Sequence, residues 1–174
     1  LYVHGNHDTR YDKNPPEGCD CIDDSIVVYN GLRILGLGGC RKYHPGEHQY
    51  TEKQMRRRIR KLKFLLWRHK GVDIVVTHAP PRNLGDDNDP AHWGFEALLE
   101  LLDKYNPQYL IHGHVHSNYG MSRSRIHTRG SSTIINAFER YIIEIPDREF
   151  KLEDYGQVIY KTRFRETEYP SMVL

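Results

Sequence analysis

The apolar residues of this chain fall into short β-branched and aliphatic runs separated by longer amphipathic stretches. The runs at residues 25–29 and 33–37 flank Asn30-Gly31, the dipeptide most typical of a tight β-hairpin turn. The run at 72–77 is apolar and β-branched enough to predict a strand buried on both faces. Residues 109–111 predict another short buried strand.

Two stretches have the spacing of amphipathic helices. Thr51 with Gln54 three residues later is the signature of a capping box. The apolar residues that follow recur at helical intervals: Met55, Ile59, Leu62, Leu65 and Leu66. A second helix is predicted over residues 95–102 and ends before Asn106-Pro107. Basic residues at 56–63 predict a solvated helix face, with nucleic-acid binding as the alternative.

The order of these elements predicts the fold class. Strands alternate with helices in the middle of the chain, and residues 132–137, 140–145 and 157–164 predict antiparallel strands that close a second sheet. Residues 1–3 have the pattern of the end of a buried strand. The chain is therefore expected to form a layered α/β sandwich, in which ligands collect beyond the carboxyl ends of the parallel strands.

Composition narrows the picture only slightly. A length of 174 residues predicts one domain over residues 1–174. A formal net charge of +2 indicates neither a nucleic-acid nor a membrane partner, and no apolar run has the length of a transmembrane helix. Three cysteines without a Cys-x-x-Cys pair favour reduced thiols in a cytoplasmic protein. A zinc site at Cys19 and Cys21 is the weaker alternative, because the sequence shows no further ligands for it.

Candidate metal ligands follow three of the predicted strands. Asn6-His7 comes after the first strand, His78 after the second, and His114 and His116 after the third. Neutral imidazole is the commonest protein ligand for a transition metal. Because the ends of parallel strands meet at one edge of a sheet, these side chains predict a metal site there.

Neighbouring residues extend this prediction. Gly113 is expected to provide the bend that turns the histidines at 114 and 116 into one crevice. His112 is expected to face inward, either as a hydrogen-bond donor behind the ligands or as a packed histidine. Arg41 and Arg82 lie in loops near these segments and are candidate ligands of substrate phosphate oxygens, with ordinary surface arginine as the alternative.

Three segments together resemble the calcineurin-like metallophosphoesterase family. They are Gly5-Asn6-His7-Asp8, Thr77-His78 and Gly113-His114-Val115-His116, which occur in that family's order. The resemblance implies an α/β/β/α metallophosphoesterase-type sandwich with mixed sheets. It also implies a site for two divalent transition metals, with Mn, Fe and Zn as the candidates.

The resemblance assigns a role to each site residue. Asn6, His78 and His114 would bind one metal, and His116 would bind the other. His7 would protonate or stabilise the leaving alkoxide, and Asp8 would hold the imidazole of His7. The implied activity is hydrolysis of a phosphomonoester, phosphodiester or pyrophosphate by metal-assisted attack of water or hydroxide at phosphorus.

The sequence departs from the family at its start. The family's first two motifs, Asp-x-His and the Gly-Asp that supplies the bridging carboxylate, would precede Gly5 and are absent. We therefore expect a truncated domain that lacks its N-terminal β-α-β portion and is catalytically crippled as it stands. The alternative is a family member that serves as a binding scaffold. An unpaired apolar edge at residues 1–3 predicts self-association.

Overall fold

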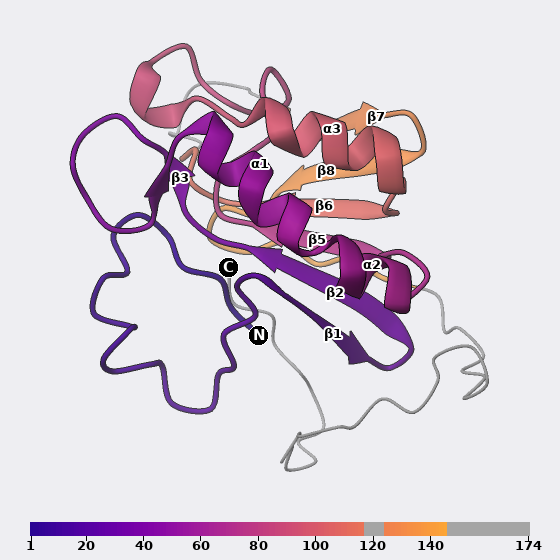
Figure 1. The fold of residues 1–174 in the computed structure, drawn as a ribbon. Coiled ribbons are helices and arrows are strands. Elements are labelled where there is room, and N and C mark those ends of the chain that lie inside the picture. The colour runs from indigo at the N-terminus through magenta and orange to yellow at the C-terminus, as the bar shows by residue number, and fades with distance from the viewer. Residues whose placement is uncertain (117–123, 146–174) are drawn as a thin grey trace.

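A computed structural model of the chain describes residues 1–116 and 124–145. Its centre is a six-stranded sheet with the strand order β1-β2-β5-β6-β8-β7 (Figure 1). The strands are β1 (Ser25–Tyr29), β2 (Leu32–Leu37), β5 (Ile74–Thr77), β6 (Tyr109–His112), β7 (Ile126–Arg129) and β8 (Ser132–Asn136). The four inner strands are parallel, and β1 and β7 are antiparallel to their neighbours at the two edges. The expected mixed α/β class is confirmed.

The hairpin at the β1 edge forms where the sequence predicted it. Tyr29 pairs with Leu32 across the turn. Asn30 and Gly31 both have positive φ, 45° and 75°. This is the conformation that a two-residue turn requires and that Asn and Gly adopt most easily.

Three α-helices cover one face of the sheet (Figure 1). They are α1 (Glu52–Lys61), α2 (Lys63–Arg68) and α3 (Glu96–Tyr105), and a short 3₁₀ helix, η1 (Pro90–His92), precedes α3. Thr51 and Gln54 form the predicted capping box at the start of α1. Asn106, in the left-handed conformation, ends α3, as expected for a residue at that position.

The alternation of side chains along the strands divides the core in two. The residues facing the helices include Leu35, Val75, Leu110 and Ile134, each fully buried. The opposite face carries Ile34, Ile74, Val76 and Ile111. Burying one such side chain stabilises the fold by roughly 1.5–3 kcal/mol. Both faces are apolar because the inner strands are covered on both sides.

Other predicted strands differ from the structure. Residues 1–3 form no strand; Tyr2 makes an isolated parallel bridge with Cys21 instead. β8 does not belong to a second sheet, because it pairs in parallel with β6 and joins the main sheet. Residues 140–145 are irregular, and the strand predicted at 157–164 lies outside the described residues.

Two short strands occur near Arg41, which was expected to lie in a loop. β3 (Cys40–Arg41) and β4 (Gln49–Tyr50) pair in parallel as a two-stranded sheet. All three cysteines are free thiols. In the part of the chain that the structure describes, no helix is both long and apolar enough to cross a membrane.

Candidate metal centre

Three of the predicted ligands meet beyond the carboxyl end of the sheet. Asn6 Oδ1 lies 2.8 Å from His78 Nε2, and the same nitrogen lies 3.0 Å from His114 Nδ1. Asn6 is buried, and both histidines are half-buried. An amide oxygen and two imidazole nitrogens at these separations form a donor set that suits a divalent transition metal.

The sheet positions these ligands. β5 and β6 are neighbours in register, with Val76 opposite Ile111. Their pairing continues past the strand ends, because the backbone N–H of Gly113 donates to the carbonyl of His78 at 3.1 Å. His78 and His114 therefore leave adjacent strands at nearly the same level.

The bend after β6 lies at His114 rather than at Gly113, where it was expected. His114 has φ of 65°, a left-handed conformation that L-residues rarely adopt, whereas Gly113 has no positive φ. Such backbone strain is about 1–3 kcal/mol and is concentrated at functional sites. Here it directs the imidazole of His114 toward His78.

A hydrogen bond fixes the tautomer of His114. Its Nε2 donates to the carbonyl of Ala91 at 2.8 Å, which leaves the lone pair on Nδ1, the atom that faces His78. A carbonyl behind a ligating histidine is a common arrangement in metal sites, because it orients the ring and increases its basicity.

Both histidines are neutral at physiological pH. Burial, together with the positive charge that His114 and His7 can carry, lowers the pKa of His78 to about 3. Burial likewise lowers the pKa of His114 to about 4, against the hydrogen bond to Ala91, which raises it. Neutral imidazole is the form that binds a metal.

His7 and Asp8 occupy different surroundings from each other. His7 is exposed and its Nε2 lies 3.1 Å from Asn6 Nδ2, so it lies beside the three ligands. Asp8 accepts a hydrogen bond from the backbone N–H of Gly5 at 2.7 Å. Asp8 therefore stabilises the turn that carries Asn6 and His7, a contact different from the His7 pairing that the resemblance implied.

Among the described residues, no hydrogen bond joins His116 to the three predicted ligands. His116 is exposed, and its ring stacks on Phe138 with centroids 4.5 Å apart. Over residues 1–116 and 124–145, His116 belongs to no group of three His, Cys, Asp or Glu side chains whose ligand atoms lie close together. The donor set therefore fits one metal, and a second metal at His116 stays a prediction.

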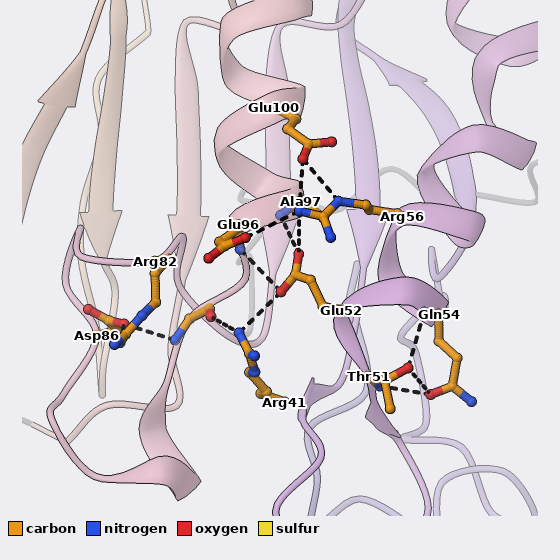
Figure 2. Close-up of polar contacts among 11 residues, drawn as sticks. Arg41, Thr51, Glu52, Gln54, Arg56, Arg82, Asp86, Glu96, Ala97 and Glu100 are labelled. Carbon is orange, nitrogen blue, oxygen red and sulfur yellow. Dashed lines mark hydrogen bonds and ion pairs between the residues drawn. The ribbon is translucent and has the colours of Figure 1, made fainter.

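The two candidate arginines are engaged with acidic partners. Arg41 pairs with Glu52 at 3.2 Å, and Arg82 pairs with Asp86 (Figure 2). Both guanidinium groups also lie over the ring of Trp93, at 5.7 and 5.0 Å. A role in binding substrate phosphate would require at least one of them to exchange its partner, and it stays a prediction.

The basic run of α1 is also partly neutralised. Arg56 pairs with three glutamates, Glu52, Glu96 and Glu100 (Figure 2). Arg58 pairs with Asp24 at 2.8 Å. These contacts favour the solvated-face interpretation, while nucleic-acid binding through this helix stays a prediction.

Sequence reasoning missed two residues beside the centre. The hydroxyl of Tyr43 accepts a hydrogen bond from Asn6 Nδ2 at 3.3 Å. The ring of His92 lies 5.1 Å from that of His114. Neither directly follows one of the apolar runs in the sequence, so the signal that located the predicted ligands could not find them. His112 is fully buried as expected, with Nδ1 3.0 Å from the carbonyl of Gly113.

Comparisons with known proteins show which family the sequence resembles. The profile of the calcineurin-like phosphoesterase family matches residues 1–118. The UPF0046 protein K07C11.7 of Caenorhabditis elegans is 34% identical over 161 residues, covering 79% of this chain and 50% of that protein. A second UPF0046 protein of that organism, C25E10.12, is 35% identical over 72 residues, 38% of this chain and 24% of its own length.

One of two matched solved structures is similar in fold. One crystal structure matches with a TM-score of 0.50 and 19% identity, over 69% of this chain and 46% of its own. The protein TT1561 of Thermus thermophilus matches with a TM-score of 0.47 and 16% identity, over 68% of this chain and 49% of its own. The chain spans about half the length of the first curated relative. It belongs to the calcineurin-like phosphoesterase family.

Proposed function

We propose that this chain carries the metal-binding centre of a phosphoesterase, in which Asn6, His78 and His114 hold one divalent transition metal. The observation that carries the proposal is the close approach of three ligand atoms. Asn6 Oδ1 lies 2.8 Å from His78 Nε2, and His78 Nε2 lies 3.0 Å from His114 Nδ1. A metal at such a site lowers the pKa of a bound water and polarises a phosphoryl oxygen. The substrate class is a phosphomonoester, phosphodiester or pyrophosphate, and the location is cytoplasmic.

The other residues of the site have supporting roles in this proposal. His7 is exposed beside Asn6, where it can donate a proton to a leaving alkoxide. Tyr43 positions the amide of Asn6 through its hydroxyl. His116 is the one described histidine of the final motif left for a second metal. A second metal at His116 completes the proposal, with Mn, Fe and Zn as candidates for both positions.

A non-catalytic binding function is the second candidate. It is favoured by the surroundings of His116, whose ring stacks on Phe138 and which belongs to no group of three His, Cys, Asp or Glu ligand atoms among the described residues. A site that holds one metal lacks the two-metal clamp on the attacking and leaving oxygens. Such a chain would bind metal and phosphate without hydrolysing an ester.

Metal analysis combined with phosphatase assays tests both candidates. The chain is titrated with Mn²⁺ and Zn²⁺ and assayed with p-nitrophenyl phosphate and bis-p-nitrophenyl phosphate. We expect His78→Ala to weaken metal binding at this site at least tenfold and to lower the rate of any hydrolysis at least a hundredfold, because one of the three proposed metal ligands is lost. His44→Ala is the matched control, since His44 is an exposed loop histidine.

The possible results separate the candidates. Metal binding with hydrolysis that both depend on His78 supports the phosphoesterase. Metal binding that depends on His78 without hydrolysis supports the binding function. If the His78→Ala and His44→Ala variants bind the same number of metals with the same affinities, both candidate functions are contradicted.

A further inference from the structure

A second group of metal-ligating side chains surrounds His4, just before the turn that carries Asn6. His4 is 7% exposed. Its Nδ1 lies 2.7 Å from Asp23 Oδ2, and its backbone N–H donates to the same oxygen at 3.2 Å. The other oxygen of Asp23 accepts from the backbone N–H of Gly38. Asp23 is therefore held as a carboxylate behind the His4 ring.

The bond to Asp23 determines the tautomer of His4. A carboxylate can only accept, so Nδ1 carries the proton and the lone pair lies on Nε2. This Nε2 is buried and has no hydrogen-bond partner in the structure. Buried polar atoms are rarely left without a partner, and one that is unsatisfied often marks an ion or a ligand site.

Two further ligands face this nitrogen. Asp12 Oδ1 lies 3.4 Å from His4 Nε2, and Asp12 Oδ2 lies 3.1 Å from His48 Nε2. The ligand atoms of these three residues all lie within 4.8 Å of one another. His48 precedes β4, and Figure 1 shows the N-terminal loop lying beside the loop between β3 and β4.

We propose that His4 Nε2, the Asp12 carboxylate and His48 Nε2 bind a divalent transition metal of the zinc class. Ligand atoms around a tetrahedral ion at bond lengths of 2.0–2.2 Å are roughly 3.3–3.6 Å apart, close to the separations of 3.4 and 3.1 Å found here. Asp23 has the place of the carboxylate that orients a ligating histidine from behind. Water completes the coordination on the side of Asp12, which is the exposed member of the group.

Small movements complete the geometry. The rings of His4 and His48 are stacked with centroids 4.4 Å apart and an interplanar angle of 3°. His48 Nε2 donates to Asp12 Oδ2 at 3.1 Å in the structure, so metal binding requires the tautomer of His48 with its proton on Nδ1. The two Nε2 lone pairs then converge on one ion when the rings tilt toward each other at the Asp12 side. His4 is fixed by Asp23 and by burial, so the tilt falls to His48 and Asp12, which belong to loops.

Cys21 is close to this group but is not one of the ligands. Its Sγ lies 3.5 Å from His4 Nδ1, the nitrogen that already donates to Asp23. A metal on that side would have to replace the proton on His4 Nδ1 and break its bond to Asp23. Desolvation also raises the pKa of the Cys21 thiol, which disfavours the thiolate that a metal requires.

Binding there would have a structural consequence for the candidate metal centre. The carbonyl of His4 accepts from the backbone N–H of Gly39 at 2.6 Å, and Asn6 follows His4 by two residues. A metal at His4 would therefore join the loop containing Asp12, the segment before β4 and the start of the ligand-bearing turn. Its role is to fix that turn rather than to contact substrate.

Zinc titration in a background without the candidate metal centre tests the proposal. The 174-residue chain carrying His78→Ala and His114→Ala is titrated with Zn²⁺, and bound metal is counted per chain. We expect one zinc to remain. Adding Asp12→Asn or His48→Ala should weaken that binding at least tenfold, whereas His44→Ala, a change in the same loop as His48, should leave it unchanged.

Two more measurements keep the result decisive. Circular dichroism shows whether each variant is folded. If His48→Ala is unfolded, the zinc affinity of Asp12→Asn alone tests the proposal. Cobalt(II) binding should give visible bands without the near-ultraviolet charge-transfer band of a thiolate, and Cys21→Ser should not alter them. Absence of zinc in the double variant, equal effects of the His48 and His44 changes, or loss of cobalt binding in Cys21→Ser would overturn the proposal. None of these outcomes depends on phosphatase activity.

Discussion

Gly5 lies directly against the imidazole of His78: a Cβ at position 5 would be 2.8 Å from His78 Cε1 and 3.0 Å from His78 Nδ1. Contacts below 3.0 Å force a shift, and the ring of His78 has little room because it is held between Asn6 and His114. We expect Gly5→Ala to displace the ring and weaken metal binding at the candidate centre at least tenfold, because site geometry must be kept within about 0.5 Å.

Gly113→Ala is the matched control for that change. A Cβ at position 113 meets no atom within 4 Å, and Gly113 has no positive φ. Metal titration by calorimetry should therefore give nearly the wild-type affinity for Gly113→Ala. Equal affinities for the two variants would show that the close contact at Gly5 does not position His78.

Glu52 stabilises α3 from a neighbouring helix. Its carboxylate accepts from the backbone N–H of Ala97 at 2.6 Å and of Glu96 at 3.3 Å (Figure 2), and Phe95 at the N-cap provides no side-chain hydrogen bond. A negative charge at a helix N-terminus is favourable because it satisfies free N–H groups and opposes the helix dipole. We expect Glu52→Gln to lower the free energy of unfolding by about 1–2 kcal/mol in urea.

Glu100→Gln serves as the control for Glu52→Gln. Glu100 is an exposed partner of Arg56 and has no role at a helix terminus. Exposed ion pairs contribute about 0–1 kcal/mol, so this change should have a smaller effect. A larger loss from Glu100→Gln than from Glu52→Gln would contradict the capping role.

Asp73 joins β2 to β5 through Arg33. The two side chains form a two-point ion pair, with Arg33 Nη2 2.7 Å from Asp73 Oδ1 and Arg33 Nε 2.8 Å from Asp73 Oδ2. The Asp73 side chain is only 4% exposed. Removing one partner of a buried pair costs about 3–5 kcal/mol, and we expect Asp73→Ala to reduce the free energy of unfolding by this amount.

The exposed pair of Asp103 with Arg129 provides the comparison. Its geometry is similar, with separations of 2.6 and 2.7 Å, but both side chains are well exposed. Asp103→Ala should reduce the free energy of unfolding by less than about 1 kcal/mol. Denaturant titrations of the two alanine variants measure the difference, and similar losses would mean that burial does not set the strength of the Asp73 pair.

Stability should also fall in mild acid because of His112. This side chain is 0% exposed, and burial lowers the pKa of its imidazole to about 4. Below the unfolded-state pKa of about 6.5, the unfolded chain takes up a proton that the folded chain resists until about pH 4. The free energy of unfolding is therefore unaffected above about pH 6.5 and decreases between about pH 6.5 and 4.

Urea unfolding at a series of pH values measures this effect. One such histidine contributes a slope of about 1.4 kcal/mol per pH unit within that window. His112→Gln should reduce the slope by about this amount, and His44→Gln tests the loss of an exposed histidine. An unchanged slope in His112→Gln would show that the acid sensitivity has another origin.

The sequence predicted those features that depend on neighbouring residues. Asn30-Gly31 and the Thr51–Gln54 box are such local signals, and both elements formed as expected. The close approach of Asn6, His78 and His114 was anticipated because each follows an apolar run. The carboxyl end of a parallel strand is a place where local sequence indicates a position in the tertiary structure.

Features that depend on distant segments could not be predicted. The cap of α3 by Glu52 and the group around His4 join residues 8 to 45 positions apart. The placement of β8 was wrong for a related reason: its apolar pattern suits either sheet, and only pairing with β6 decides between them. Residues 1–3 also have a strand-like pattern, but Tyr2 pairs with Cys21 alone.

The geometry of the candidate metal centre depends on the register in which β5 pairs with β6. Val76 opposes Ile111, and the ligands follow after short, fixed intervals. Deleting a single residue from β6 would retract its tip by about 3.3 Å, farther than a metal–nitrogen bond is long. Length changes in the polar turns of this protein can be absorbed where they occur, whereas a slip in this one ladder would disperse the ligands.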